Sequence, residues 1–463
     1  MSDNGKELAK TMAVSFKIQE KFLKSGSIEE GLASLTEEEK SVLGTLQIGL
    51  SNLLKPKRRE IAMEWVKCGY NYWNNIVLKG LEEGRKVVYF FFTHSPEIYY
   101  ALDLIPICVE YQSVVAALTW ASGAEDGIDR IEAEGFPSHL CSTQKATMGY
   151  LLMNKVPKPD IIVKPVGACD ASNMSYQWIA ESTGAKFIPI DTPYAMDERS
   201  FEYYVREFHK MVKRLEELTG QELDPEKLRK IVECSNEAYG YLLETLELRK
   251  AIPCPDPGFS HISAAGIMLT NVGLPQGVEY FKKCRDITKR NVEKEVGVVP
   301  EGMEEIRTLW TNVPILFDIS FYEWMEEELG AVHLFDALDW FFTEPIDTSS
   351  TESIIRGLAK RSFNWPMHRQ GLGYADTWID DFVWLAKEYR ADCAIFGGHM
   401  ACKHSWGLNK LLSDALKKEA GIPSLRFDMD IADKRFASIS DIKAKMTEFI
   451  QTVREAKKRR KLG

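Results

Sequence analysis

Continuous apolar runs that stop abruptly at Gly, Pro or polar residues constrain the fold of this chain most strongly. The clearest runs are Lys86–Phe92, Asp160–Val166 and Ala391–Phe396. A run of this kind is typical of a parallel strand that helices cover on both faces. Helical patterns lie between the runs. The sequence therefore predicts an α/β fold with two Rossmann-like, doubly wound lobes built on parallel sheets.

The chain has 463 residues, which is long for a single hydrophobic core. We expect a helical N-terminal arm or cap at 1–84, because this part has helical patterns and little strand signal. The first α/β lobe is predicted at 85–200, a helical connector at 201–310 and the second lobe at 311–463. The second lobe is expected to open with a strand at Val313–Asp318 and to close with a C-terminal helix.

Charge and cysteine usage argue against several classes of protein. A net charge of −10 provides no broad positive surface for nucleic acid. The N-terminus lacks an apolar signal-peptide core, and no run of about 18 apolar residues occurs, so we expect a cytoplasmic protein that does not bind membranes. The nine cysteines are then thiols or metal ligands rather than disulfides, and no Cys-x-x-Cys pair indicates a zinc ribbon.

Three cysteines lie in loops where apolar runs give way to Gly, Pro and polar residues. Cys141 follows a Gly-Phe-Pro sequence, Cys169 follows the second apolar run, and Cys402 follows a Gly-Gly-His sequence. Ligands of open α/β sheets collect beyond the carboxyl ends of strands, and thiolates favour soft metals and iron–sulfur clusters. We therefore predict a shared site, in which three thiolates would leave one iron of a 4Fe–4S cube open. The alternative is that these are ordinary buried thiols.

A zinc site is a second interpretation of the same region. His399, Cys402 and His404 could bind zinc together with another thiolate, but the favoured explanation is that His404 is a surface residue or a neighbour of a ligand. No HExxH motif indicates a metalloprotease, and no GxGxxG or GxxxxGK[ST] sequence indicates a nucleotide site. If the reaction needs ATP, another protein must hydrolyse it.

Polar residues near the predicted strand ends are further candidates for chemistry. Thr93, His94 and Glu110 lie near the ends of the early strands of the first lobe, where they could hydrogen-bond a substrate hydroxyl or carry a proton. From the residues alone, ordinary capping and strand-end polarity are favoured over a role in chemistry. The segment Phe427–Asp433 places three acidic residues beyond a strand, and a structural loop is favoured there over a cation site.

Several motifs give the chain a resemblance to a known family. They are the Cys402-Lys403 pair with Trp406-Gly407, the sequence Gly421-Ile-Pro423, and Phe427-Asp-Met-Asp-Ile-Ala-Asp-Lys-Arg435. Weaker matches are Pro159-Asp160 leading to Cys169, Asp191-Thr-Pro-Tyr194, and Ser95-Pro-Glu-Ile98 before Leu104-Ile-Pro106. In these features the chain resembles the 2-hydroxyacyl-CoA dehydratase and benzoyl-CoA reductase family over about 85–455, in the 2-hydroxyglutaryl-CoA dehydratase component type.

The resemblance implies a cofactor, partners and a reaction. In such proteins three cysteines, here Cys141, Cys169 and Cys402, hold a 4Fe–4S cluster whose fourth iron has no thiolate. Glu110 and Thr93 match the family's hydroxyl-handling positions. Family members pair with a homologous second subunit and receive a low-potential electron from a separate ATP-hydrolysing iron–sulfur activator. The resemblance thus implies an oxygen-sensitive acyl-CoA dehydratase, with a benzoyl-CoA reductase-type subunit or a non-catalytic electron-relay subunit as alternatives.

Overall fold

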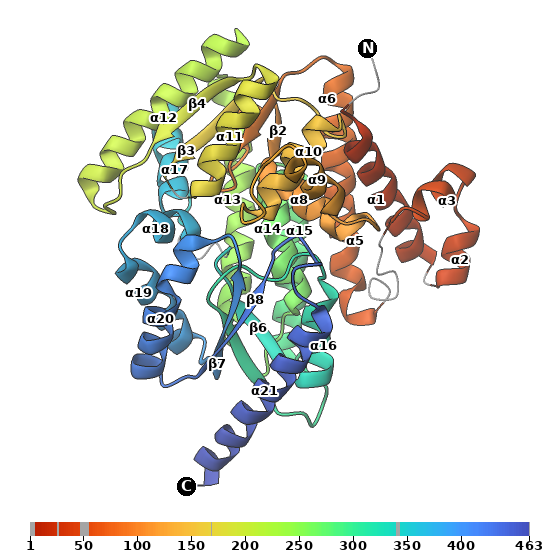
Figure 1. Ribbon diagram of the computed structural model, residues 1–463, viewed down its shortest axis with the longest axis vertical. Helices are drawn as coiled ribbons and strands as arrows, with labels where there is room; N and C mark the ends of the chain where they lie inside the picture. The colour runs from red at the N-terminus through yellow and green to blue at the C-terminus, as the bar shows by residue number, and fades with distance from the viewer. Residues whose placement is uncertain (1–4, 26, 47–54, 168, 339–342, 463) are drawn as a thin grey trace.

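The computed structural model describes residues 5–25, 27–46, 55–167, 169–338 and 343–462 (Figure 1). It contains two four-stranded parallel sheets, with strand orders β2-β1-β3-β4 and β6-β5-β7-β8. Helices connect successive strands, so the predicted α/β class with two doubly wound lobes is confirmed. The two sheets share one strand order although no residue-level repeat is visible in the sequence.

The strands of the first sheet coincide with the apolar runs of the sequence. They are β1 (Val87–Phe90), β2 (Ile105–Cys108), β3 (Ile161–Val166) and β4 (Lys186–Asp191). All residues of β1 and β2 are buried, as expected for strands covered on both faces. Helices α7 (Glu97–Ala101), α8 (Val109–Thr119), α9 (Glu125–Glu132), α10 (Ser142–Leu152) and α11 (Asp170–Thr183) complete this lobe.

The second sheet consists of β5 (Ile306–Trp310), β6 (Ala331–Phe335), β7 (Cys393–His399) and β8 (Ser424–Met429). The strand expected at Val313–Asp318 is therefore wrong, because the first strand of this sheet ends at Trp310 and the expected segment is irregular. Pro314 has no N–H to donate to a strand neighbour, which disfavours a central strand there. The true strand was missed because it carries Arg307, whose buried guanidinium pairs with Glu305 at 2.8 Å.

The N-terminal region is helical, as expected. Its elements are α1 (Glu7–Ser25), α2 (Ile28–Ala33), α3 (Glu37–Leu43), α5 (Pro56–Tyr70), the π-helix η1 (Asn71–Leu78) and α6 (Lys79–Glu82). Thr36 and Glu39 form the capping box that starts α3. Leu8, Met12 and Phe16 of α1 are at most 2% exposed and belong to the main core. In Figure 1 these helices lie against the first lobe, with α2 and α3 at the outside.

Four long helices link the two lobes: α12 (Glu198–Thr219), α13 (Pro225–Leu248), α14 (Gly258–Thr270) and α15 (Pro275–Glu293). Asp224 caps α13, and Pro225 occupies its first turn. The remaining helices are α16 (Ser320–Leu329), α17 (Thr351–Phe363), α18 (Pro366–Leu372), α19 (Ala375–Glu388), α20 (Lys403–Ala415), η2 (Leu416–Ala420) and α21 (Ile439–Leu462). In the described part of the chain, none of the helices has both the length and the apolarity needed to span a bilayer.

The shared strand order defines where each sheet offers a binding site. In a sheet of order 2-1-3-4 the chain winds in opposite directions on either side of strands 1 and 3, which leaves a crevice beyond their carboxyl ends. The relevant loops are those after β1 and β3 in the first sheet, and those after β5 and β7 in the second. All four loops contribute to one cavity.

Candidate active site

A cavity of about 570 Å³ opens where residues of both lobes meet. Its volume falls in the range of pockets that hold small molecules and cofactors. Phe91 and Phe92 after β1, Cys169 after β3, Leu316 after β5 and Cys402 after β7 all line it. The cavity therefore lies at the position that the topology of both sheets predicts for a ligand.

The three loop cysteines come together at this cavity, and each immediately precedes a helix. Cys141 is the N-cap residue of α10, Cys169 of α11 and Cys402 of α20. All three are half-buried and line the cavity. Cys169 and Cys402 follow β3 and β7, which are equivalent strands of the two sheets. The free N–H groups and the dipole at a helix N-terminus favour negative charge, so each sulfur lies where a thiolate is stabilised.

The thiols are nevertheless neutral without a further cation. Burial raises the pKa of Cys141 to about 11, and burial also raises the pKa of Cys169 and Cys402. The negative charge of a Cys141 thiolate would raise the pKa of Cys169 further, and that of a Cys169 thiolate would raise the pKa of Cys402 further. Three neighbouring thiolates thus repel one another, and a bound cationic group would displace their protons and relieve this repulsion.

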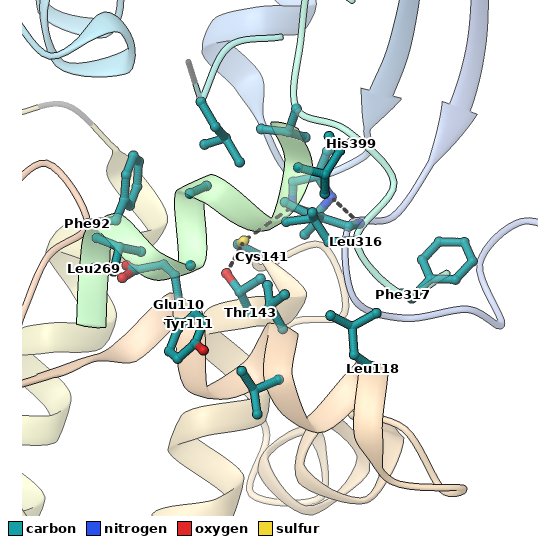
Figure 2. A pocket seen from close by; sticks show the side chains of 18 of the residues that line it. Phe92, Glu110, Tyr111, Leu118, Cys141, Thr143, Leu269, Leu316, Phe317 and His399 are labelled. Carbon is teal, nitrogen blue, oxygen red and sulfur yellow. Dashed lines mark hydrogen bonds between the residues drawn. The ribbon is translucent and has the colours of Figure 1, made fainter. Parts of the chain in front are cut away.

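His399 and Asp430 bring a histidine–carboxylate pair to Cys141. The Nε2 atom of His399 lies 3.2 Å from Cys141 Sγ, and its Nδ1 lies 3.4 Å from a carboxylate oxygen of Asp430. Thr143 lies on the other side of the sulfur, with its hydroxyl oxygen 3.1 Å away (Figure 2). When Cys141 is a thiolate it has no proton to give, so His399 must donate through Nε2–H. Asp430 is itself fixed by the N–H groups of Ala432 and Asp433, which supports the structural loop expected for Phe427–Asp433.

Glu110 provides a carboxyl group on the same cavity, at the first turn of α8. Gln144 donates to its Oε1 at 2.6 Å, and Tyr176 donates to its Oε2 at 3.0 Å. The thiol of Cys108 adds a contact at 3.3 Å. Burial raises the pKa of Glu110, although these donors oppose the shift. A carboxyl group whose pKa is raised and whose orientation is fixed suits a proton donor.

Thr93 and His94 lie behind the cavity wall. Both are at most 3% exposed, and neither is among the described residues that line the cavity. His94 Nε2 lies 3.2 Å from the hydroxyl of Tyr204, and burial lowers the His94 pKa to about 3, so the ring is neutral. Their roles in the chemistry stay a prediction, while Glu110 is the residue of the three that has access to the cavity.

Within the described ranges of the chain, the three sulfurs do not form a compact group of ligands for a single ion. Among the described residues, the group of three potential ligands within 4.8 Å of one another is His261, His333 and Asp336, and no cysteine belongs to it. One ion would need all three sulfurs within such a radius, whereas in an iron–sulfur cube each thiolate binds a different iron. The zinc interpretation also loses a ligand, because His404 is exposed at the rim. Thiols are nevertheless the donor type that iron–sulfur clusters use, and three of them line this cavity.

The histidine group elsewhere in the second lobe has a packing explanation. His333 lies at 6.0 Å from the ring of Trp310 and at 5.1 Å, edge to face, from that of Tyr322. His261 contacts Phe335 edge to face at 5.5 Å. These rings form one aromatic cluster, so the histidines contribute to the core of this lobe.

Sequence reasoning missed one charged side chain beside the site. Lys164 lies in β3, is fully buried, and places its Nζ 4.0 Å from the centre of the Phe91 ring. Burial lowers its pKa to about 8, while the charges of Cys169 and Glu110 oppose the shift. The signal was present in the sequence, because a lone charge within an apolar strand run is unusual.

The protein has two parallel sheets with the same strand order. A cavity beyond the carboxyl ends of their central strands is lined by three thiols and a carboxyl group. These features define an α/β protein with a thiol-rich binding site. The chain belongs to the family of the 2-hydroxyglutaryl-CoA dehydratase D-component, whose model matches residues 92–453. The resemblance stated from sequence motifs is thereby confirmed.

Curated relatives are similar over most of the chain but at low identity. The chain is 22% identical over 367 residues to the (R)-phenyllactyl-CoA dehydratase alpha subunit of Clostridium sporogenes, covering 77% of this chain and 87% of the relative. It is 20% identical over 390 residues to the (R)-2-hydroxyisocaproyl-CoA dehydratase alpha subunit of Clostridioides difficile, covering 82% and 93%. It is 21% identical over 307 residues to the (R)-2-hydroxyglutaryl-CoA dehydratase alpha subunit of Acidaminococcus fermentans, covering 63% of this chain and 60% of the relative.

Proposed function

We propose that this chain is the subunit of a 2-hydroxyacyl-CoA dehydratase that holds a 4Fe–4S cluster on Cys141, Cys169 and Cys402. The substrate is an acyl-CoA thioester that binds at the iron without a cysteine. The observation that carries the proposal is the convergence on one cavity of three thiols, from both lobes, whose residues occupy the N-cap positions of helices. Membership of the dehydratase family supports it.

The overall reaction removes the hydroxyl group from C2 and a proton from C3, and it yields a 2-enoyl thioester and water. The bound cluster would supply one low-potential electron and a Lewis-acidic iron for the thioester carbonyl. Glu110 is the residue we assign to proton transfer, because its carboxyl group lines the cavity, is held by Gln144 and Tyr176, and has a pKa that burial raises. His399 holds the sulfur of Cys141 through its Nε2–H.

Partners follow from the same proposal. The relatives are named as alpha subunits, so we expect a second, homologous subunit in the complex. An ATP-hydrolysing iron–sulfur activator would provide the electron. Without that activator the oxidised complex should bind a thioester and stop there, which separates binding from turnover.

A spectroscopic titration tests the proposal. The complex is purified without oxygen, and a 2-hydroxyacyl-CoA thioester is added before the activator. A catalytic subunit with an open iron should show a change in the electron paramagnetic resonance or Mössbauer signal of the cluster. A cluster that gives the same spectrum with and without thioesters would instead fit an electron-relay subunit. Turnover of aromatic acyl-CoA thioesters alone would favour the ring-reductase alternative.

A further inference from the structure

One wall of the cavity comes from helices outside the matched family region. The family match begins at residue 92, yet α1 and α5 both line the cavity. The residues concerned are Met12, Ser15, Phe16 and Gln19 of α1, and Arg58 and Trp65 of α5. Those of α1 recur at the spacing of a single helix face, so one stripe of this helix is directed to the cavity. The N-terminal region therefore shapes the ligand site of this chain.

Two aromatic rings of this wall, Phe16 and Trp65, continue into Phe259 of α14, whereas Ser15, Gln19 and Arg58 contribute polar groups. The rings of Phe16 and Trp65 meet edge to face at 5.1 Å, and those of Trp65 and Phe259 do so at 6.0 Å. Phe16 packs on Gly69, where an added Cβ would come within 2.2 Å of the ring. The three rings belong to α1, α5 and α14, so they form one continuous surface across three helices.

Helix α8 connects the wall to the carboxyl group of the site. Glu110 at its first turn and Leu118 near its last turn both line the cavity, together with Tyr111, Val114 and Val115 between them. Eight residues of helix correspond to about 12 Å. Beyond Glu110 the lining side chains of this helix carry no charge as far as Leu118. A ligand that reaches past Glu110 along α8 thus enters an apolar space.

The charge in this space is already neutralised. Of the described lysines and arginines that line the cavity, Arg58 is the buried one, and its Nε lies 3.2 Å from Glu323. Lys55 also pairs with Glu323, at 3.1 Å, and with Glu327 at 2.8 Å. The positive charges of Arg58 and Lys55 are balanced by the negative charges of Glu323 and Glu327. Arg58 Nη2 keeps a hydrogen-bonding position without a partner among the described residues, so an acyl group that ends in a carboxylate is the competing ligand.

The exposed rim has a different character. Lys403, His404 and His139 lie there and are exposed. Cationic and imidazole side chains at the entrance suit the phosphates of coenzyme A, whereas the interior suits hydrocarbon. The polarity of the cavity thus gives a thioester one favourable orientation.

We infer that the aromatic wall of α1, α5 and α14 receives the end of the acyl group, and that it selects an apolar, branched or aromatic acyl group over one that ends in a carboxylate. The inference rests on the proposed function. Transfer of a carboxylate into this space would cost several kcal/mol without a net positive charge to receive it. Apolar acyl groups gain from the same surroundings, because each buried methylene favours binding.

Binding to the oxidised complex without activator tests the preference, with three 2-hydroxyacyl-CoA thioesters that carry a phenyl, a branched alkyl or a carboxylate end. We expect the two apolar thioesters to bind at least about 100-fold more tightly than the carboxylate thioester. Equal or tighter binding of the carboxylate thioester would overturn the inference and leave the proposed function intact. Failure to bind any thioester would overturn both.

Two variants test the wall itself. Trp65→Ala enlarges the cavity and should shift relative affinity about 10-fold towards a longer apolar acyl group, and Trp384→Ala, at an exposed tryptophan of α19, is the matched control. Val114→Leu fills space from α8 without changing the rings of Phe16, Trp65 and Phe259, and it should shift relative affinity towards a shorter acyl group. If neither variant changes the ratio of the affinities for longer and shorter acyl groups more than the control does, the wall does not contact the acyl group.

Discussion

The hydrogen bond from His399 to Cys141 leads to a prediction that can be worked out from the structure. His399→Leu removes the Nε2–H that lies 3.2 Å from the sulfur. A donor of this kind stabilises the reduced cluster more than the oxidised one, because reduction places additional negative charge on the sulfurs. We therefore expect the variant to have a more negative reduction potential.

The size of the effect follows from the energy of one hydrogen bond. A buried hydrogen bond to a charged group contributes about 1.5–3 kcal/mol. Only the difference between the two oxidation states changes the potential, and we take it as about 1 kcal/mol. Since about 1.4 kcal/mol corresponds to 59 mV for one electron, the expected shift is about 40 mV.

An anaerobic redox titration monitored by electron paramagnetic resonance measures this shift. His404→Leu is the matched control, because His404 also lines the cavity but is exposed at its rim. Iron content is measured in parallel, so that loss of the cluster is not mistaken for a shift. A His399→Leu variant with full iron and an unchanged potential would refute the role of this hydrogen bond.

Three other predictions concern single residues. Glu110→Gln keeps the shape of the carboxyl group but not its proton, so turnover should fall at least about 100-fold with iron content and thioester affinity retained, as steady-state kinetics would show. Burial raises the pKa of Glu326 to about 7, so the native state loses stability as pH rises from 4.5 to 7. The Glu326→Gln variant should therefore have a free energy of unfolding about 3 kcal/mol higher than the unchanged protein at pH 8, and the same value near pH 4. Denaturant titration measures both values. Gly149→Ala would place a Cβ 1.8 Å from the carbonyl oxygen of Gly127 where α9 and α10 touch, and thermal unfolding should show a loss on the order of 3 kcal/mol. An equal pH profile for the glutamine variant, or an unchanged melting temperature for the alanine variant, would contradict these arguments.

Most of the fold was predictable from the sequence because the inner strands of both sheets are buried on both faces. Such strands leave apolar runs, as at Val87–Phe90 and Ile161–Val166, and these runs located the strands. The wrong prediction of a strand at Val313–Asp318 also arose from an apolar run that is buried. That segment is apolar because it lines the cavity and packs on the core, while the true strand hides a buried arginine. Apolar runs report burial, and only topology distinguishes a strand from a buried loop.

The candidate site was predictable in part. Loop position selected Cys141, Cys169 and Cys402, and the structure brings all three to one cavity. The contact between His399 and Cys141 joins residues 258 positions apart, and no local pattern encodes such a pair. The contribution of α1 was also hidden, because its cavity-lining residues have the same helical spacing as core residues.

Iron and sulfide analysis of cysteine variants tests the central claim most directly. The complex, purified and reconstituted without oxygen, should contain about four iron atoms and four sulfides for this chain. Cys402→Ser should lose most of them, while Cys234→Ser, at a half-buried cysteine of α13 away from the cavity, should retain them. Full iron and sulfide in the Cys402→Ser variant would contradict the assignment of the three thiols to one cluster.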